Sequence, residues 1–310
     1  MCVSNSPTEF RSIDFEAFLN YDPHPASFNI NIWFPQTDYT VKIKGSCRGF
    51  ILLFRRPDIF YIWNPSTGFK KQIPLSPFDS KVVEFLFSHL YGFGYDQSRD
   101  DYLVVVLSHE PTEENPFTSH LEIFSNRDNR WKEIEGTHFP YFGDQEGLLF
   151  NGAIHWLALR PDLDIYVIVA FDLMERKLFE MPLPDDFHQE LVSMASGLWV
   201  FGEFLGLWGK HYDNTVEIWV MKEYTLNSSW TKTFVLPRNS IPNYYFSPIC
   251  STNNGDIIGT MCGTCLVKLN DKGQPLRHRS FRNSLSNIVM YTESLLSLPG
   301  DNDQVYKLEE

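Results

Sequence analysis

The chain has 310 residues and a formal net charge of −13, and 43% of its residues are hydrophobic and 15% aromatic. Such a composition can bury a core, which excludes a wholly disordered chain. Acidic residues spread along the sequence repel phosphate backbones and anionic lipid heads, so nucleic acid and membrane are disfavoured as main partners, whereas basic proteins are not.

The sequence shows no targeting segment and no membrane span. Residues Met1 to Thr8 are small and polar, without the basic start and apolar stretch of a signal peptide. The longest apolar runs, such as Tyr102 to Leu107, have the length of strands and are too short to cross a bilayer. Five cysteines, an odd number in a chain this long, do not resemble a disulfide framework. We therefore predict a protein of the cytoplasm, the nucleus or both.

Apolar residues recur with a period of two, which is typical of β-strands. Val216, Ile218 and Val220, for example, occupy alternate positions. Turn-forming Gly, Pro, Asn and Asp interrupt the chain roughly every ten residues, the spacing of an antiparallel all-β domain. A helix is suggested only over residues 186–195, where it would be short.

A repeated unit indicates which all-β domain this is. The unit consists of a β-rich strand, a polar turn, and a second strand that holds an aromatic or basic residue. Its turn centres are spaced by roughly 47 to 61 residues, close to the ~40–50 residues of a four-stranded propeller blade. The widest spacing contains the acidic loop 110–120, which we interpret as an insertion. The copies begin at Ile59, Leu121, Ile168, Val216 and Cys265, and the last copy is degenerate.

Another strand pair precedes each copy, and a few strands remain at the two ends of the chain. The pairs lie at 49–54, 91–107, 148–159, 198–208 and 249–260, and the remaining strands lie at 13–18, 28–34 and 288–298. We predict an all-β fold, a β-propeller of about six four-stranded kelch-like blades. Strands from the N- and C-terminal ends would share the last blade, closing the ring and removing exposed sheet edges. Because no linker rich in Gly, Ser or Pro divides the sequence, residues 1–310 are predicted to form a single domain.

An ordered series of short motifs covers the chain from Phe10 to Pro299. The motifs are Lys44–Leu53 (KGSCRGFILL), Ile62–Gly68 (IWNPSTG), Tyr91–Asp96 (YGFGYD), Asp100–Val105 (DDYLVV), Asn151–Ala158 (NGAIHWLA), Ala170–Leu173 with Pro182–Pro184, Val216–Tyr224 (VEIWVMKEY) with Ser229–Lys232, and Tyr291–Ser297 (YTESLLS). Each motif alone is unspecific. In this order the chain resembles the F-box-associated, kelch-like domain of plant F-box proteins, including the S-locus F-box lineage.

The resemblance implies a substrate receptor of an SCF-type (cullin-RING) ubiquitin ligase, without catalytic residues or cofactors of its own. In that family an N-terminal F-box binds a Skp-type adaptor, and the propeller loops bind the protein to be ubiquitinated. Residues 1–44 lack the Leu-Pro start and the apolar helical stripe of an F-box. The prediction is therefore an F-box-associated propeller with the F-box absent, which contacts a Skp-type adaptor and a cullin only if an F-box is supplied.

Two other functions are compatible with this fold. A propeller without its F-box could be a stand-alone protein-interaction module, or a decoy that shields targets from ubiquitination. A kelch-type propeller enzyme, such as a copper oxidase or a sugar-modifying hydrolase, is the remote alternative, because propellers host many activities. The sequence contains no phosphate-cradling glycine loop, nucleophile elbow or His-Glu-x-x-His run to support it.

Cysteine and histidine side chains have simpler structural explanations than catalysis or metal binding. Cys262-Gly-Thr-Cys265 could hold zinc or be redox-active, but no second pair lies at zinc-finger spacing, and a hairpin turn explains the motif. His155 alternates with apolar neighbours along a strand. We expect it to be packed and hydrogen-bonded rather than to act as a base or a ligand.

Charged pairs and repeated tryptophans also have structural explanations. Asp100–Asp101 and Asp185–Asp186 are predicted to be solvated turn residues, because neighbours on a strand point apart. Arg55–Arg56 and Lys70–Lys71 are too short to form a nucleic-acid stripe and are predicted to be solvated. The tryptophans are expected to pack in the core between blades rather than to form a ligand cage, and they are Trp63, Trp131, Trp156, Trp219 and Trp230.

The predicted protein-binding site is a set of loops, and no individual side chain is assigned to it. We selected loops that exceed the length of a hairpin and carry mixed aromatic and charged residues. They are Ser76–Leu90, Glu110–His120, Thr137–Glu146, Arg160–Asp164 and Arg238–Tyr245.

Overall fold

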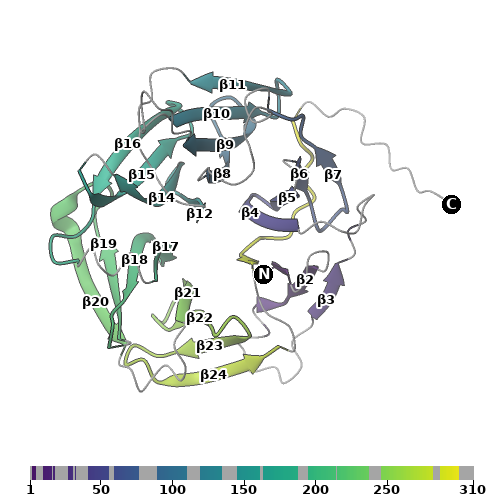
Figure 1. Ribbon diagram of the computed structural model, residues 1–310. Coiled ribbons are helices and arrows are strands. Elements are labelled where there is room, and N and C mark those ends of the chain that lie inside the picture. Colours follow the sequence, from purple (N-terminus) through teal and green to yellow (C-terminus); the bar gives the residue numbers. More distant parts are fainter. Residues whose placement is uncertain are drawn as a thin grey trace. The chain divides into compact units, whose positions relative to one another are not determined.

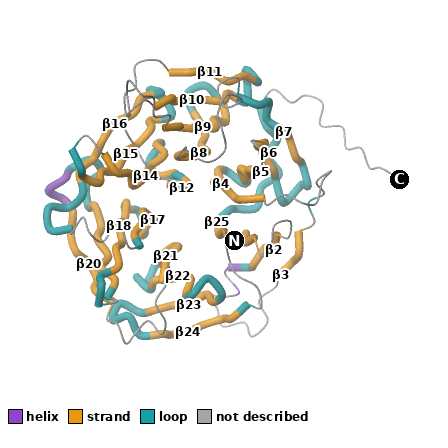
Figure 2. Tube along the Cα trace, viewed as in Figure 1, coloured by secondary structure: helices purple, strands orange, loops and turns teal. Residues whose placement is uncertain are grey.

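The described part of the protein, seen in a computed structural model, consists almost entirely of strands and turns (Figures 1 and 2). The structure describes residues 2–4, 10–15, 17, 27–30, 32, 41–55, 59–76, 89–109, 119–134, 145–160, 163–187, 195–213, 215–236, 246–281 and 287–299. Within these ranges, helical structure is limited to a turn after Asp14 and the 3₁₀ turn Asn227–Ser229. The all-β prediction is confirmed, and most of the predicted short helix at 186–195 lies outside the described residues.

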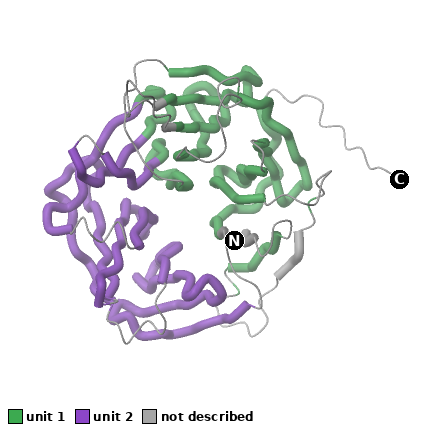
Figure 3. Tube along the Cα trace, in the orientation of Figure 1, with its two compact units in different colours: residues 1–154, 171–177, 287–310 green, residues 155–170, 178–286 purple. Residues whose placement is uncertain are grey.

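The chain divides into two compact units (Figure 3). Unit 1 comprises residues 1–154, 171–177 and 287–310, and unit 2 comprises residues 155–170 and 178–286. The single domain over residues 1–310 stays a prediction, as does the number of blades.

One sheet of unit 1 holds strands from both ends of the sequence. Its order is β25-β1-β2-β3, with β1 at Cys2–Ser4, β2 at Phe10–Ile13, β3 at Ser27–Ile30 and β25 at Asn287–Val289. Strands β1 and β25 are antiparallel, and Val3 lies opposite Ile288. The prediction that the N- and C-terminal strands share a sheet is confirmed.

Two further sheets of unit 1 contain the first two copies of the repeat. The first has the order β4-β5-β6-β7, with β4 at Val41–Cys47, β5 at Phe50–Arg55, β6 at Ile59–Trp63 and β7 at Lys70–Gln72. The second has the order β11-β10-β9-β8-β12, with β8 at His89–Asp96, β9 at Asp101–His109, β10 at Ser119–Ser125, β11 at Arg130–Ile134 and β12 at Gln145–Glu146. Strand β12 was not predicted, and it pairs with β8 in parallel.

The boundary between the units runs through the next sheet along the chain. Its order is β13-β14-β15-β16, with β13 at Leu148–Phe150, β14 at Ala153–Arg160, β15 at Ile165–Asp172 and β16 at Lys177–Pro182. These strands contain the third copy of the repeat and the strand pair predicted to precede it.

The last two copies of the repeat, together with the strand pair that precedes each, form an eight-stranded sheet in unit 2. Its order is β20-β19-β18-β17-β21-β22-β23-β24. Its strands are β17 (Ser196–Phe201), β18 (Phe204–Lys210), β19 (Val216–Met221), β20 (Trp230–Leu236), β21 (Phe246–Ser251), β22 (Ile257–Met261), β23 (Cys265–Leu269) and β24 (Pro275–Ser280). Its two antiparallel halves meet where Val200 pairs in parallel with Cys250.

Strand β5 shows why some strands lack alternation of apolar and polar residues. All six of its residues are buried, because both faces of the strand are covered. Phe50, Leu52 and Phe54 join one apolar cluster with side chains of β8 and β9. Ile51 and Leu53 join a second cluster, which includes β2 and β4. The continuous apolar run Phe50–Phe54 therefore marks an inner strand between two packed layers.

Two of the predicted terminal strands have different bounds. The strand predicted at 13–18 is Phe10–Ile13, and it ends where the Asp14 carboxylate accepts a hydrogen bond from the Ala17 backbone N–H (2.9 Å). This is the pattern of a helix N-cap, so Asp14 starts a helical turn.

The strand predicted at 288–298 pairs only over Asn287–Val289. Residues 290–299 follow without strand structure, and we call them the C-terminal strap.

Gly49 allows the C-terminal strap to approach the β4–β5 turn. Its φ is +88°, and a Cβ there would overlap the Cβ of Ser294. An alanine at a positive φ costs roughly 1–2 kcal/mol, and overlap with Ser294 adds to that cost. We expect Gly49→Ala to lower the free energy of unfolding in urea by about 2 kcal/mol or more.

Gly68→Ala is the matched control, because Gly68 has φ +75° and a Cβ added to it would enter open space, with nothing within 4 Å. It should lose only the conformational part, about 1 kcal/mol. Equal losses for the two variants would contradict the close contact between the strap and the β4–β5 turn.

Candidate protein-binding surface

Each set of four consecutive antiparallel strands has two ends, at which different connections lie. In the sheet β8–β11, Asp96 pairs with Asp101 at the end where the short connections 97–100 and 126–129 lie. We call this the turn end. The connection 110–118 lies at the opposite end, which we call the loop end. Because the strands alternate in direction, the other four-strand sets have the same arrangement.

The five predicted target-binding loops all connect strands at loop ends. They join β7 to β8, β9 to β10, β11 to β12, β14 to β15 and β20 to β21. Loop 238–245 lies wholly outside the described residues, and most of 76–90, 110–120 and 137–146 does too. Of 160–164, residues 161 and 162 lie outside. The assignment of target binding to these loops stays a prediction.

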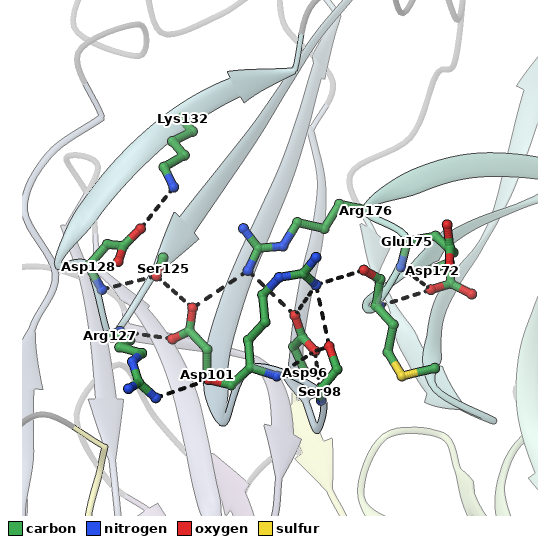
Figure 4. A network of polar contacts seen from close by, with 12 residues as sticks. Asp96, Ser98, Asp101, Ser125, Arg127, Asp128, Lys132, Asp172, Glu175 and Arg176 are labelled. Atoms are coloured by element: carbon green, nitrogen blue, oxygen red, sulfur yellow. Dashed lines mark hydrogen bonds and ion pairs between the residues drawn. The ribbon is translucent and has the colours of Figure 1, made fainter.

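A buried carboxylate organises the turn end of unit 1 (Figure 4). The side chain of Asp96 is 0% exposed. Its Oδ1 accepts hydrogen bonds from the backbone N–H groups of Ser98 (3.0 Å) and Arg99 (3.2 Å), and its Oδ2 accepts one from the Arg99 guanidinium (2.8 Å). Burial alone would raise the pKa of Asp96, but hydrogen bonds from Ser98 and Arg99 outweigh it and hold the pKa below its usual value.

Asp101 extends this network to the β10–β11 turn, and its predicted solvation is wrong. The residue is 2% exposed. Its carboxylate accepts hydrogen bonds from Ser125 Oγ (2.6 Å) and from the Arg127 backbone N–H (2.8 Å). Asp101 is buried because it ties two neighbouring turns of one sheet together, whereas the adjacent Asp100 is exposed.

The β15–β16 turn joins the same network through arginine. Arg176 Nη2 lies 3.5 Å from Asp96 Oδ2 and 3.8 Å from Asp101 Oδ2. Arg99 Nη1 donates a hydrogen bond to the backbone oxygen of Met174 (2.8 Å). Three turns that are distant in sequence are therefore fixed to one another by charge-assisted hydrogen bonds and ion pairs.

The C-terminal strap covers two turns of unit 1. Asn64 Nδ2 donates hydrogen bonds to the backbone oxygens of Ser294 (2.9 Å) and Leu296 (3.3 Å). Asn126 Nδ2 donates to the backbone oxygen of Pro299 (3.1 Å). The strap is therefore held by side chains at the turn ends of both β4–β7 and β8–β11, where strand pairing is absent.

The loop end of unit 2 presents an exposed aromatic side chain on a hydrogen-bonded connection. Tyr212, between β18 and β19, is 70% exposed. The backbone N–H of His211 donates to the backbone oxygen of Thr215 (2.9 Å). Asp213 Oδ1 accepts hydrogen bonds from the backbone N–H (2.9 Å) and Oγ1 (2.7 Å) of Thr215. The turn thus holds Tyr212 outward without packing its ring.

Glu217 anchors this turn to the sheet. Its Oε1 lies 2.9 Å from His211 Nε2 and accepts a hydrogen bond from Lys232 Nζ (2.8 Å). Trp219 Nε1 donates to Oε2 (3.1 Å). Burial alone would raise the pKa of Glu217, but hydrogen bonds from Lys232, Trp219 and His211 outweigh it and lower the pKa. Glu217 therefore favours its charged form, and its contact with His211 holds the residue next to Tyr212.

The Cys262-Gly-Thr-Cys265 motif is a hairpin turn, as predicted. Met261 pairs with Cys265, and the turn between them contains Cys262 (φ 53°) and Gly263 (φ 61°). The Cys262 side chain is exposed and that of Cys265 is buried. Among the described residues, no group of three His, Cys, Asp or Glu side chains is placed to hold a metal ion.

Thiol reactivity should follow burial. Burial raises the pKa of both Cys47 and Cys250 to about 12, whereas Cys262 is exposed. We expect iodoacetamide at mildly alkaline pH to alkylate Cys262 in the folded chain, and to alkylate Cys47 and Cys250 only after denaturation. Peptide mass spectrometry would measure this, and rapid labelling of Cys47 in folded protein would contradict its placement.

The histidine and tryptophan predictions are confirmed in most cases. His155 is buried, and its Nε2 lies 2.7 Å from the hydroxyl of Tyr224. Four of the five repeated tryptophans are buried, whereas Trp131 is only partly buried and donates a hydrogen bond from Nε1 to the backbone oxygen of Pro74 (2.7 Å). The buried four are Trp63, Trp156, Trp219 and Trp230.

One of the basic-pair predictions is wrong. Arg55 is 7% exposed, because it ends the inner strand β5. Lys71 Nζ donates a hydrogen bond to Asn126 Oδ1 (3.0 Å), which connects two sheets of unit 1. Asp185 and Asp186 are exposed, as predicted. None of the described helical segments is long and apolar enough to cross a membrane.

Sequence reasoning missed two features of the candidate surface. Asp96 and Asp101 are buried among partners that lie up to 80 positions away in the sequence, and no local sequence pattern predicts these contacts. Tyr212 is preceded and followed by polar residues in a short connection. An aromatic side chain inside a polar turn could have indicated an exposed anchor.

Successive, mainly antiparallel sheets, one of which holds both terminal strands, define this protein as a β-propeller. Residues 9–267 match the F-box associated beta propeller domain. The chain therefore belongs to the F-box-associated β-propeller family, which confirms the resemblance and the fold class.

Named relatives in Arabidopsis thaliana are consistent with this family. The chain is 28% identical to the F-box protein CPR1 over 87% of this chain and 71% of the relative. It is 27% identical to an F-box/kelch-repeat protein over 63% of this chain and 53% of the relative. A third, named an F-box protein, is 25% identical over 83% of this chain and 67% of the relative. The match thus spans about half to seven tenths of the lengths of these relatives.

Proposed function

We propose that this chain is the substrate-recognition module of an SCF-type (cullin-RING) E3 ubiquitin ligase, and that it binds a target protein at the loop ends of its sheets. One observation carries the proposal. In unit 1 the described turn end is closed by contacts of the buried Asp96 and by the C-terminal strap, whereas the long connections from one sheet to the next leave from the loop ends. Function in scaffold proteins concentrates on such connections.

The family supports the assignment to ubiquitin ligation, because the named relatives are F-box proteins. In this proposal the chain is a non-catalytic receptor without a cofactor. Transfer of ubiquitin belongs to other subunits, and a Skp-type adaptor and a cullin join through an F-box. We expect the protein in the cytoplasm, the nucleus or both.

A fusion of this chain to an F-box tests the proposal. The fusion should co-precipitate a Skp-type adaptor and a cullin, and it should increase ubiquitin on the proteins that it binds. The unfused chain should bind the same proteins and, by competition, lower their ubiquitination, which is the behaviour of a decoy. The proposal fails if the fusion recruits adaptor and cullin but leaves the ubiquitination of its bound proteins unchanged.

A further inference from the structure

The loop end of unit 2 combines an exposed apolar anchor with unpaired negative charge. Tyr212, between β18 and β19, and Leu163, between β14 and β15, are both exposed. Tyrosine is enriched among residues that dominate protein interfaces, because it buries a large area while losing little side-chain freedom. The hydrogen bonds within His211–Thr215 hold the turn before any partner arrives, which lowers the entropic cost of binding.

The charges at the two ends of unit 2 differ. At the turn ends, basic residues adjoin acidic ones, as Lys222 adjoins Glu223 and Lys272 adjoins Asp271. The described loop-end connections of unit 2 contain no Lys or Arg. Their carboxylates form no ion pair with any described residue, and they are Asp164, Asp185, Asp186 and Asp213.

Cations close to Tyr212 contact other carboxylates. His211 and Lys232 both contact the buried Glu217. Arg160, which ends β14, pairs with Glu180 (2.7 Å). The neighbouring sheet contributes to the same side of unit 2, because the hydrogen bond between His155 and Tyr224 joins the two sheets near their turn ends. The described loop-end connections of unit 2 therefore carry carboxylates and exposed apolar side chains, without Lys or Arg.

We propose that Tyr212 is an anchor residue of the target-binding surface, and that the target segment it contacts carries lysine or arginine beside an apolar side chain. This inference rests on the proposed function and specifies the chemistry of the partner. Charge complementarity selects the occupant: an acidic segment would meet unpaired carboxylates, whereas a basic one would neutralise them. The apolar side chain of the target would cover the ring of Tyr212 and exclude water.

Selection from a phage-displayed library of random peptides, with the whole chain as bait, tests the inference. We expect the enriched peptides to combine Lys or Arg with an aliphatic or aromatic residue. Tyr212→Ala should raise the Kd of an enriched peptide by about thirtyfold, whereas Tyr212→Phe should change it far less. Leu226→Ala, at an exposed position on the turn end of the same sheet, is the matched control and should leave the Kd unchanged.

Removal of carboxylate charges measures the electrostatic part of peptide binding. Asp185→Asn, Asp186→Asn and Asp213→Asn together should weaken binding and flatten its dependence on salt, and asparagine at 213 retains an oxygen that can accept the Thr215 hydrogen bonds. Glu203→Gln, Glu223→Gln and Asp271→Asn remove the same formal charge at turn ends and should have no effect. Unchanged urea midpoints would show that all variants are folded.

Two results would overturn the inference: enrichment of peptides without basic residues, or affinity that is unchanged by Tyr212→Ala. Neither result would affect the F-box fusion experiment, in which bound proteins are ubiquitinated wherever they contact the chain. Conversely, failure of ubiquitination in the fusion, together with basic peptides that require Tyr212, would preserve the surface and refute the ligase role.

Discussion

Replacement of Asp96 by alanine should lower the free energy of unfolding by about 3 kcal/mol. The change removes a carboxylate that is 0% exposed, and with it the hydrogen bonds that it accepts from two backbone N–H groups and the ion pair with Arg99. Arg99 can turn toward solvent, because its side chain is 50% exposed, so the loss should lie near the lower limit for a broken buried pair. Urea denaturation followed by circular dichroism would measure it.

Asp128→Ala is the control within the same network. Its carboxylate pairs with Lys132 (2.8 Å) and Arg130 (3.7 Å), but all three side chains are substantially exposed. Exposed pairs contribute little, so the loss should stay below about 1 kcal/mol. Similar losses for Asp96→Ala and Asp128→Ala would show that the buried network does not hold the turns together.

The contribution of Asp96 to the free energy of unfolding should also depend on pH, and it should decrease as the pH falls. Its pKa is lower in the folded chain than the usual 3.8, so the unfolded state binds the proton more readily. The stabilisation is therefore complete above the unfolded-state pKa and is lost as the pH falls through the folded-state pKa. The difference in unfolding free energy between the wild-type chain and Asp96→Ala should shrink below about pH 4.

Replacement of Leu298 by alanine should lower the free energy of unfolding by about 3 kcal/mol. Leu298 is 2% exposed and joins the apolar cluster of Phe50, Leu52 and Phe93 in unit 1. Truncation would leave a cavity between the C-terminal strap and the sheets that it covers. The same urea experiment would measure the loss.

Leu295→Ala provides the control, three positions earlier on the strap. Leu295 is 85% exposed, so its truncation should change the unfolding free energy by less than about 0.5 kcal/mol. Equal effects of the two substitutions would mean that the strap does not pack in the register described, with Leu298 inward and Leu295 outward.

Repetition made most of the fold predictable from sequence. Five copies of one strand–turn–strand unit located the outer strands of successive sheets, and alternating or continuous apolar runs located the inner ones. The terminal segments were less predictable. Residues 288–298 alternate like a strand, but beyond Val289 their backbone bonds to Asn64 and Asn126 side chains instead of a neighbouring strand. Such a choice depends on residues far away in the sequence.

The candidate surface was only partly predictable, for the same reason. Loop length and composition identified connections that all leave from the loop ends. Whether a charged residue is buried, however, depends on its three-dimensional neighbours. Asp100 and Asp101 are adjacent and chemically identical, yet only Asp101 meets Ser125 and the Arg127 backbone. Arg55 is buried at the end of the inner strand β5, which a short basic pair in the sequence does not indicate.

Photo-crosslinking at the two ends of one sheet tests most directly whether the loop end receives the target. A benzophenone amino acid would replace Tyr212 at the loop end or Leu226 at the turn end of β17–β20, both of which are exposed. In plant cells treated with a proteasome inhibitor, the Tyr212 position should capture a ubiquitinated protein, and the Leu226 position should not. Capture of that protein from Leu226 alone, or equally from both positions, would contradict target binding at the loop end.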